Sequence, residues 1–410
     1  MPQASRTAHH KAGASNSRIL LALFAYVCLL FYGSLYPFGV WHWPDYPLLQ
    51  FLPQWPARMS RADLLQNVLV YAPFGLLCTL WLAQSMSAAR AVLLAVTLGA
   101  MVSLVIECLQ QFNPARVPSS VDIAMNTLGA AGGALLATTI VRHTVPGAFI
   151  LAWRDLWFRQ GALANTGLVV LAFWMLSQTS PLVPSMDIGY WRHALSGLWR
   201  ALHDPYAIDL ARLARYACMS TGLGLMVLLL GRPGKPVMLL FAAALAAVLL
   251  AKIVVISRVL SLEAICGSAL ALAACLVLRH LPARLLPALG IGLVAAGFTM
   301  SQLMTGEGGG IGAPFNWMPF AGHMRSFTAL ENILELLWPF MALAWFVRWS
   351  APDKAPGLRI VTGTLLVGSA VLVLEWQQQW TPGRYGDITQ VMLCMAGWII
   401  PWCVRDPGAD

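Results

Sequence analysis

The sequence predicts an all-α integral membrane protein with about twelve transmembrane helices. Of its 410 residues, 59% are hydrophobic and 10% are charged, whereas soluble globular domains average about 25% charged residues. Four stretches long enough to cross a bilayer carry no formal charge: 19–41, 64–89, 160–186 and 285–306. Because their apolar residues are continuous and do not alternate with polar ones, we expect helices and not a barrel.

The apolar segments are taken in chain order as transmembrane helices. The first follows a polar start with Arg6, Lys11 and Arg18 that resembles a signal peptide. No small-residue cleavage site follows it, so we expect an uncleaved first helix. The twelve expected helices span residues 19–39, 63–85, 91–111, 119–141, 161–180, 213–231, 236–256, 260–278, 285–304, 328–347, 358–378 and 386–404.

The basic residues of the connecting segments predict the orientation. Fifteen of the 26 Lys and Arg residues fall on the side that holds both termini, and eleven fall on the other. The positive-inside rule therefore places both termini in the cytoplasm. The external connections carry Trp43, Trp55, Trp191 and Trp199, and we expect these loops to lie on the membrane surface, where indole rings prefer the headgroup level.

Composition and spacing argue against several classes of site. Lys and Arg are scattered singly between apolar runs, so no nucleic-acid partner is expected. The eight cysteines also lie singly, without a C-x-x-C pair, which predicts neither a metal site nor a disulfide framework. We therefore expect no cofactor and no metal, and the pattern assigns no catalytic residue.

The chain matches itself without a gap between residues 104–133 and 372–401, at an offset of 268. The matched positions include charged and amide residues, which apolar composition alone would not reproduce. A looser match at an offset of 142 aligns Arg116 and Ser119 with Arg258 and Ser261. We therefore expect tandem four-helix units in parallel orientation, at residues 1–145, 146–281 and 282–410, with the middle one degenerate.

The first unit carries a set of spaced polar, proline and glycine residues across four helices. They are Ser34-Leu35-x-Pro37-Phe38, Asn67, Pro73-x-Gly75, Glu107-x-x-Gln110, Arg116 and Asp122-x-x-x-Asn126-x-x-Gly129-x-x-x-Gly133. Over residues 19–141 this pattern resembles the VanZ-like family of bacterial membrane proteins, named after a teicoplanin-resistance protein. The resemblance implies a multi-pass protein of the bacterial plasma membrane and a role in the cell envelope, with a contribution to glycopeptide resistance.

The last unit matches this pattern less completely. It keeps Glu375, Gln378, Arg384, Asp387 and Gly397, but Gln390 and Cys394 replace the Asp–Asn pair, and Pro401 stands where the first unit has its last glycine. If that pair is needed for activity, the last unit is a degenerate partner.

The polar residues of the motif are expected to meet near the outer leaflet. Helical spacing puts Glu107, Gln110 and Gln111 on one face, and Asp122 and Asn126 on one face of the next helix. Charges in a membrane segment are by default functional candidates. We expect these residues, with Arg116 and the matching Glu375, Gln378, Arg384 and Asp387, to bind an anionic lipid-linked molecule, because guanidinium groups suit phosphate.

A structural interpretation competes with binding at each position. Glu107 and Arg116 could pair across the connection, while Asp122 and Asn126 could cap backbone groups or link helices. Gly129 and Gly133 form a small-xxx-small surface that favours close helix packing. Asn67, Pro73 and Gly75 are expected to be structural, with Pro73 kinking its helix.

Three classes of function remain open. The first is a binder or remodeller of envelope lipids, with membrane lipids and envelope-assembly proteins as partners. The second is a transporter or flippase in which Glu107 and Glu375 carry protons. The third is an enzyme in which Glu107 or Asp122 acts as general base. An enzyme should convert its substrate in detergent, a transporter should move it in sealed vesicles, and a binder should do neither.

Overall fold

The structure is a computed structural model that describes residues 3–36, 38, 41–55, 61–140, 145–180, 184–185, 187–204, 206, 208–304, 314–320, 329–351 and 356–404. Over this part of the chain it is all-α, with fourteen α-helices and one short 3-10 helix. The chain divides into two compact units, Met1–Asp155 and Leu156–Asp410. The first is close to the first unit expected from the sequence. The division expected from the sequence, into units at residues 1–145, 146–281 and 282–410, stays a prediction.

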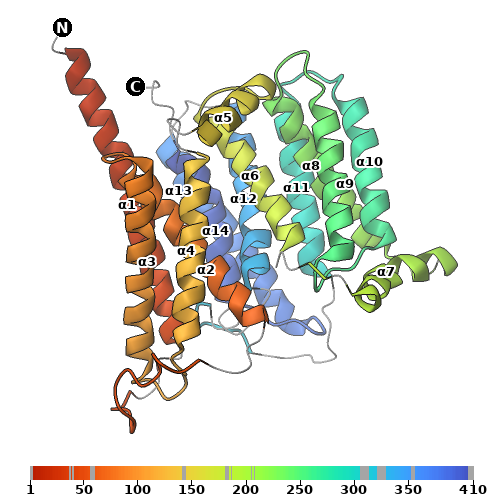
Figure 1. Cartoon of the computed structure of the whole chain (residues 1–410). Helices are drawn as coiled ribbons and strands as arrows, with labels where there is room; N and C mark the ends of the chain where they lie inside the picture. The colour runs from red at the N-terminus through yellow and green to blue at the C-terminus, as the bar shows by residue number, and fades with distance from the viewer. Residues whose placement is uncertain are drawn as a thin grey trace. The chain divides into compact units, whose positions relative to one another are not determined.

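The N-terminal unit is a bundle of four long helices, followed by a short one. They are α1 (Gln3–Leu35), α2 (Arg61–Leu82), α3 (Ala88–Gln110), α4 (Ser120–Thr138) and α5 (Val145–Trp157), which ends at the start of the second unit. Tyr71, Phe74, Ile106 and Ala130 are buried in the core between α2, α3 and α4. In Figure 1, α1 to α4 run side by side.

Glycines bring α2 and α4 into backbone contact. A Cβ atom on Gly129 would lie 2.2 Å from the Val68 carbonyl oxygen, and one on Gly133 would lie 1.8 Å from that of Ala72. From the other side, a Cβ on Gly75 would lie 1.9 Å from the Ala130 carbonyl oxygen. The three glycines therefore form the close-packed surface that the small-xxx-small spacing predicts.

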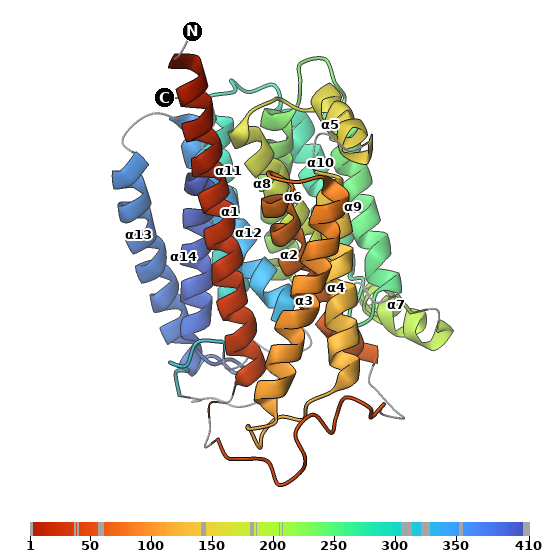
Figure 2. The ribbon, with the colours of Figure 1, turned by 60° about the vertical axis from the view of Figure 1, so that its left-hand side comes forward.

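The C-terminal unit holds the remaining helices: α6 (Ala162–Thr179), α7 (Ile188–His203), α8 (Leu210–Leu230), α9 (Val237–Val254), α10 (Leu262–Leu278), α11 (Leu286–Leu303), α12 (Ala329–Ser350), α13 (Pro356–Gln377), the 3-10 helix Gln378–Trp380 and α14 (Ile388–Cys403). Within it, α11 packs against both α8 and α12, and α6 packs chiefly against α12. Met226, Trp345 and Phe346 are buried at the centre. All but α7 are roughly aligned in Figure 2.

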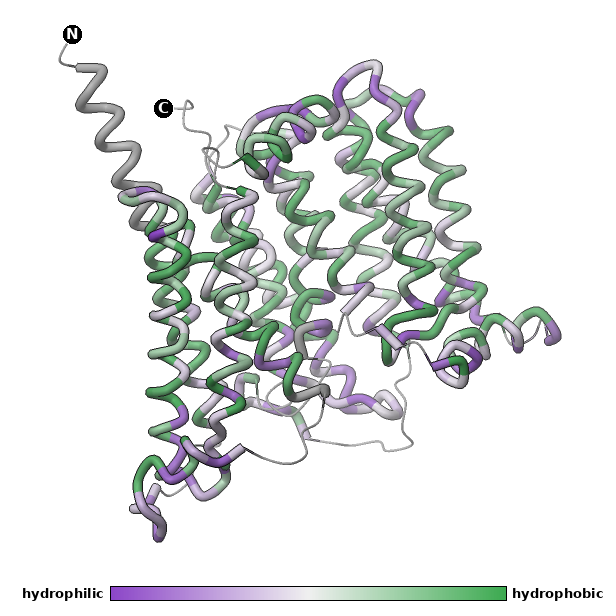
Figure 3. Tube along the Cα trace, in the orientation of Figure 1, coloured by the Kyte–Doolittle hydropathy of each residue, from purple (hydrophilic) through white to green (hydrophobic). Residues whose placement is uncertain are grey.

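The chain is a multi-pass membrane protein. Each of the twelve expected ranges contains a helix, and eight helices of the described residues are long and apolar enough to cross a membrane. Three more are shorter apolar helices, Ile19–Leu35, Leu262–Leu278 and Ile388–Cys403. Large apolar side chains such as Phe24, Leu93 and Leu365 are about two-thirds exposed (65%, 68% and 66%), as lipid-facing residues are. Figure 3 shows apolar residues along the helices and polar residues near their ends.

Two helices were not expected from the sequence, where their residues were assigned to connections. The helix α5 has 13 residues and α7 has 16, which at 1.5 Å per residue is short of the roughly 30 Å of a bilayer core. In α7, apolar residues recur at helical spacing between the polar Arg192 and Arg200. Asp187 caps the start of this helix by accepting a hydrogen bond from the Gly189 amide at 2.9 Å. Figure 1 shows α7 lying crosswise to α8–α11.

The connection expected to lie on the membrane surface with Trp191 and Trp199 is therefore a helix and not a loop. Trp199 is 67% exposed, and Leu202 beside it is 61% exposed. An exposed apolar face with arginines on the same helix is typical of an interfacial helix. Its location at the membrane surface stays a prediction.

Candidate functional site

The connection between α3 and α4 gathers the predicted polar residues of the N-terminal unit. Glu107 is buried, and its Oε2 accepts a hydrogen bond at 2.8 Å from the backbone amide of Ser119, the N-cap residue of α4. Arg116 donates from Nε to the Tyr36 carbonyl at 2.6 Å and from Nη2 to the Gly33 carbonyl at 2.9 Å. These contacts join the connection to the end of α1.

The neighbouring amides make the same kind of connection. Gln110 donates to the Ser34 carbonyl at 2.8 Å, and Asn113 donates to the Leu35 carbonyl at 2.9 Å. The backbone amide of Leu49 donates to Oε1 of Gln111 at 2.8 Å. The end of α3 therefore satisfies carbonyl groups that the last turn of α1 leaves without helical partners.

Asp122 and Asn126 link α4 to two other helices. Asn67 on α2 donates to Asp122 Oδ1 at 2.8 Å, and Asn126 donates to the Ser103 hydroxyl on α3 at 2.9 Å. The predicted residues thus make contacts between α1, α2, α3 and α4 within this unit. The contacts of Asp122 and Asn126 are of the helix-linking kind that the structural interpretation describes. The role of these residues in ligand binding stays a prediction.

The C-terminal unit repeats two of these contacts. Glu375 Oε2 accepts a hydrogen bond at 3.1 Å from the backbone amide of Asp387, the N-cap residue of α14, at positions 268 residues after Glu107 and Ser119. Arg384 donates to the Ser301 carbonyl at 2.7 Å.

Arg258 in the same unit donates to the carbonyls of Ser177 at 2.7 Å and Ser180 at 2.8 Å. Arg116, Arg258 and Arg384 therefore each hydrogen-bond backbone carbonyls near the end of a helix about 80 residues earlier. This correspondence favours three related units. Superposition of the units would test the predicted repeat.

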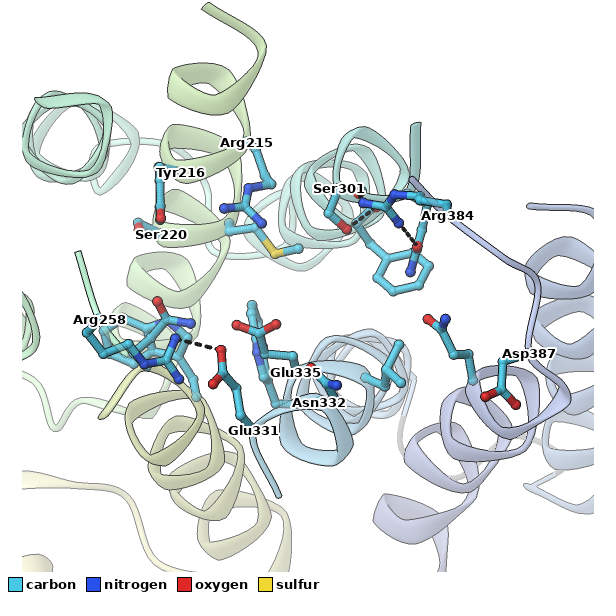
Figure 4. A pocket seen from close by; sticks show the side chains of 18 of the residues that line it. Arg215, Tyr216, Ser220, Arg258, Ser301, Glu331, Asn332, Glu335, Arg384 and Asp387 are labelled. Atoms are coloured by element: carbon cyan, nitrogen blue, oxygen red, sulfur yellow. Dashed lines mark hydrogen bonds and ion pairs between the residues drawn. The ribbon is translucent and has the colours of Figure 1, made fainter. Parts of the chain in front are cut away.

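A cavity of about 510 Å³ lies within the C-terminal unit, at the bundle end where α6, α9 and α11 finish and α8, α12 and α14 begin. Of the residues expected to bind a ligand, Arg384 and Asp387 line it, and Figure 4 shows them with their neighbours. Its lining is rich in charge, with four basic and three acidic residues: Arg215, Lys252, Arg258, Arg384, Glu331, Glu335 and Asp387.

One part of this cavity is neutralised by an ion pair. Arg258 Nη1 lies 2.7 Å from Glu331 Oε1, and the arginine side chain is 9% exposed. Lys252 is buried, interacts electrostatically with Glu331, and has its Nζ 5.8 Å from the centre of the Tyr216 ring. Glu331 therefore has two cationic neighbours.

The Asp387 side chain also makes a hydrogen bond within the protein. Its Oδ1 accepts a hydrogen bond from the Thr389 amide at 2.7 Å, which caps α14.

Two further arginines belong to a different part of the cavity. Arg384, in the connection between α13 and α14, also donates from Nη1 to Gln302 Oε1 at 3.2 Å. Burial lowers the pKa of its guanidinium below the ordinary arginine value, the Glu375 carboxylate raises it, and the positive charge of Arg215 lowers it. Arg215 and Arg384 are therefore close enough for their like charges to interact, and arginine stays protonated in such surroundings.

Sequence reasoning missed most of the cavity lining. Arg258 was matched to Arg116 but was not proposed as a site residue. Glu331 and Glu335 lie four residues apart on α12, so they share one helical face. Two carboxylates at that spacing in a mostly apolar helix were a signal that could have identified α12 as part of the cavity lining. Among the described residues, no three His, Cys, Asp or Glu side chains gather closely enough to hold a metal ion.

Comparison with known proteins agrees with the resemblance of the first unit. The VanZ/LLP1 family model matches residues 19–142. Neither the curated proteins nor the solved structures contain a match to the chain. The matched segment contains the whole α3–α4 junction with Glu107, Arg116 and Asp122. The chain is therefore a multi-pass membrane protein in which residues 19–142 are similar to the VanZ/LLP1 family.

Proposed function

We propose that this protein binds an anionic, lipid-linked molecule of the bacterial cell envelope in the cavity of its C-terminal unit. The observation that carries the proposal is the concentration of four basic and three acidic side chains around about 510 Å³ at one end of an apolar helix bundle. Small-molecule sites commonly enclose roughly 300–1,000 Å³. Charges next to the hydrocarbon region are costly, and they are retained mainly where they serve a function.

The cavity is a better place for the ligand than the α3–α4 junction. At that junction Glu107, Arg116 and Asn126 contact backbone or side-chain atoms of neighbouring helices. In the cavity, Arg215 and Arg384 face open volume. We therefore assign the junction of the VanZ-like segment to holding its helices together, and the ligand to the C-terminal unit.

The charge bias of the connections supports an external location for this site. Arg215, Lys252, Arg258 and Arg384 all fall in the group of eleven basic residues that the positive-inside rule places outside. In the plasma membrane, an external site of this kind would meet lipid-linked wall precursors at the outer face, where glycopeptides act on them.

Binding without transport agrees with the contacts of the two carboxylates expected to carry protons. Glu107 and Glu375 each accept a hydrogen bond from the backbone amide of a helix N-cap residue. Protonating either would weaken a charge-assisted hydrogen bond. A flippase would move labelled lipid across sealed vesicles, and we expect no such movement.

Equilibrium binding tests the proposal. Purified full-length protein in non-ionic detergent would be titrated with radiolabelled polyprenyl phosphate and with uncharged polyprenol of the same chain length. We expect saturable binding of the phosphate at least tenfold tighter than of the alcohol. The Arg215→Gln and Arg384→Gln variants should weaken it, whereas Arg212→Gln, an exposed position one turn before Arg215, should not. Equal binding of the two lipids would contradict the proposal.

Binding of a wall precursor would also give this protein a role in glycopeptide resistance. Glycopeptides act on lipid-linked precursors at the outer face, so a protein that occupies or redistributes those precursors should change susceptibility to teicoplanin. Expression of the wild-type chain in a susceptible bacterium should raise the inhibitory concentration. The Arg384→Gln variant, expressed to the same level in the membrane, should raise it less.

A further inference from the structure

Charge in the cavity of the C-terminal unit is divided between two walls. Arg215 from α8 and Arg384 from the connection before α14 lie along one side in Figure 4, with Ser301 between them. Glu331, Asn332 and Glu335, all from α12, lie on the opposite side. The site therefore presents a positive wall and a negative wall to whatever occupies it.

The two arginines of the positive wall have hydrogen-bond donors that an anion could use. The Nε atoms of Arg215 and Arg384 are buried without a hydrogen-bond partner among the described residues. Their like charges interact, and each repels the other. A phosphate placed between them would relieve this repulsion and accept hydrogen bonds from both planar guanidinium groups, a geometry that favours phosphate.

The negative wall has one carboxylate without a cationic partner. Glu331 pairs with Arg258 at 2.7 Å. Glu335 is one helical turn further along the same face of α12, is only partly exposed, and makes no ion pair with any described residue. The negative charge of Glu331 acts on it as well. A carboxylate in such a place is stabilised by a ligand cation, and a neutral hydroxyl would compensate its charge less completely.

We propose that the ligand is a phosphate ester that also carries a primary ammonium group, with the phosphate bound by Arg215 and Arg384 and the ammonium bound by Glu335. This assignment rests on the proposed function and narrows it: the phosphate is the anionic part of the molecule held in that cavity, and the same molecule also carries an ammonium group. The combination occurs in the phosphoethanolamine headgroup of a lipid and in free amino-phosphates. The experiment separates these two sources.

The test uses purified full-length protein in non-ionic detergent and isothermal titration calorimetry. The probes are dihexanoyl phosphatidylethanolamine, dihexanoyl phosphatidic acid, and free phosphoethanolamine. The variants are Arg215→Gln and Glu335→Gln, with Arg212→Gln as the matched control on α8, and the thermal stability of each is measured first. Should Arg215→Gln fail to fold, Arg215→Lys replaces it, since it keeps the charge and removes the planar fork.

We expect Arg215→Gln to weaken every probe about tenfold or more. Glu335→Gln should weaken the two ammonium-bearing probes by a similar factor and leave phosphatidic acid unchanged or bound more tightly. Tighter binding of the phosphatidylethanolamine than of free phosphoethanolamine identifies a lipid as the source, and equal binding identifies a soluble amino-phosphate.

Two results would overturn the assignment. One is that Glu335→Gln changes phosphatidylethanolamine and phosphatidic acid by the same factor, including no change in either. The other is that wild type binds phosphatidic acid as tightly as phosphatidylethanolamine. Either leaves the proposed function standing, because a phosphate lipid is still bound. If wild type binds neither phosphatidic acid nor polyprenyl phosphate, the proposed function itself fails.

Discussion

Two adjacent glycines in α4 allow a matched test of how the VanZ-like segment is packed. A Cβ atom on Gly133 would lie 1.8 Å from the Ala72 carbonyl oxygen and 2.9 Å from the Leu76 amide nitrogen, both on α2. A Cβ atom on Gly132 would have no atom within 4 Å. The Gly133→Ala and Gly132→Ala variants therefore make the same chemical change in the same helix, but only the first meets the neighbouring backbone.

The expected difference follows from these distances. To accommodate an alanine at position 133, the Cβ–oxygen distance must rise from 1.8 Å to at least 3.0 Å, so α2 and α4 must separate locally by about 1.2 Å. Overpacking of this kind costs about 1–3 kcal/mol, and the upper end applies because the obstacle is backbone. Both variants gain up to about 1 kcal/mol from the higher helix propensity of alanine. Gly133→Ala should therefore be about 3 kcal/mol less stable than Gly132→Ala.

The assay is reversible unfolding of the purified protein in mixed micelles with increasing SDS, followed by far-UV circular dichroism. Gly132→Ala should unfold at the wild-type SDS fraction or slightly above it, and Gly133→Ala well below it. Indistinguishable transitions for the two variants would refute the close α2–α4 contact on which the description of this unit depends.

Three further predictions concern the ion pair, the helix cap and the topology. Arg258→Gln should destabilise the protein by about 3–5 kcal/mol in the same assay, because it leaves Glu331 without its buried partner; a loss below about 1 kcal/mol would show that the pair is solvated. Glu375→Ala should cost about 1–3 kcal/mol because the buried Asp387 amide loses its acceptor, and Glu375→Gln, which keeps an acceptor oxygen, should cost less; an equal loss for both would argue against the cap. Reporter fusions at Gly13, Pro233 and Asp406 should be cytoplasmic and those at Pro53 and Ser185 external, and an external C-terminus would mean that one span is miscounted.

The helices could be predicted from the sequence because their signal is local. Each of the twelve expected apolar ranges contains a helix, since a continuous apolar run of this length has no other stable form in lipid. The two missed helices, α5 and α7, are short. In α7, arginines and histidines interrupt the apolar residues, so the segment was interpreted as a loop although its apolar residues recur at helical spacing.

The α3–α4 junction was also accessible to sequence reasoning. Glu107, Arg116 and Asp122 lie within 16 residues of one another in a helix–connection–helix, so the chain itself brings them together. What the spacing did not decide was whether they face a ligand or each other's helices. The hydrogen bonds from Ser119 to Glu107 and from Asn67 to Asp122 show protein contacts.

The cavity of the C-terminal unit could not be predicted from the sequence in this way. Its charged lining comes from α8, the end of α9 and the connection after it, the start of α12 and the connection before α14. These segments are far apart in the sequence. Their meeting depends on α11 packing against both α8 and α12, and no local pattern specifies that arrangement. The repeat offset placed Arg258 and Arg384 at matching positions, but it gave no reason to expect Arg215 and Glu335 opposite each other.

Native mass spectrometry of the full-length protein, extracted from its own membrane in non-ionic detergent, tests most directly whether the cavity holds an anionic lipid. We predict a retained adduct that fragments to a phosphate-bearing lipid and is strongly reduced in the Arg215→Gln variant, but not in the Arg212→Gln control. A wild-type protein without a phosphate-bearing adduct, or an adduct of equal abundance in the two variants, would contradict the assignment of the ligand to this cavity.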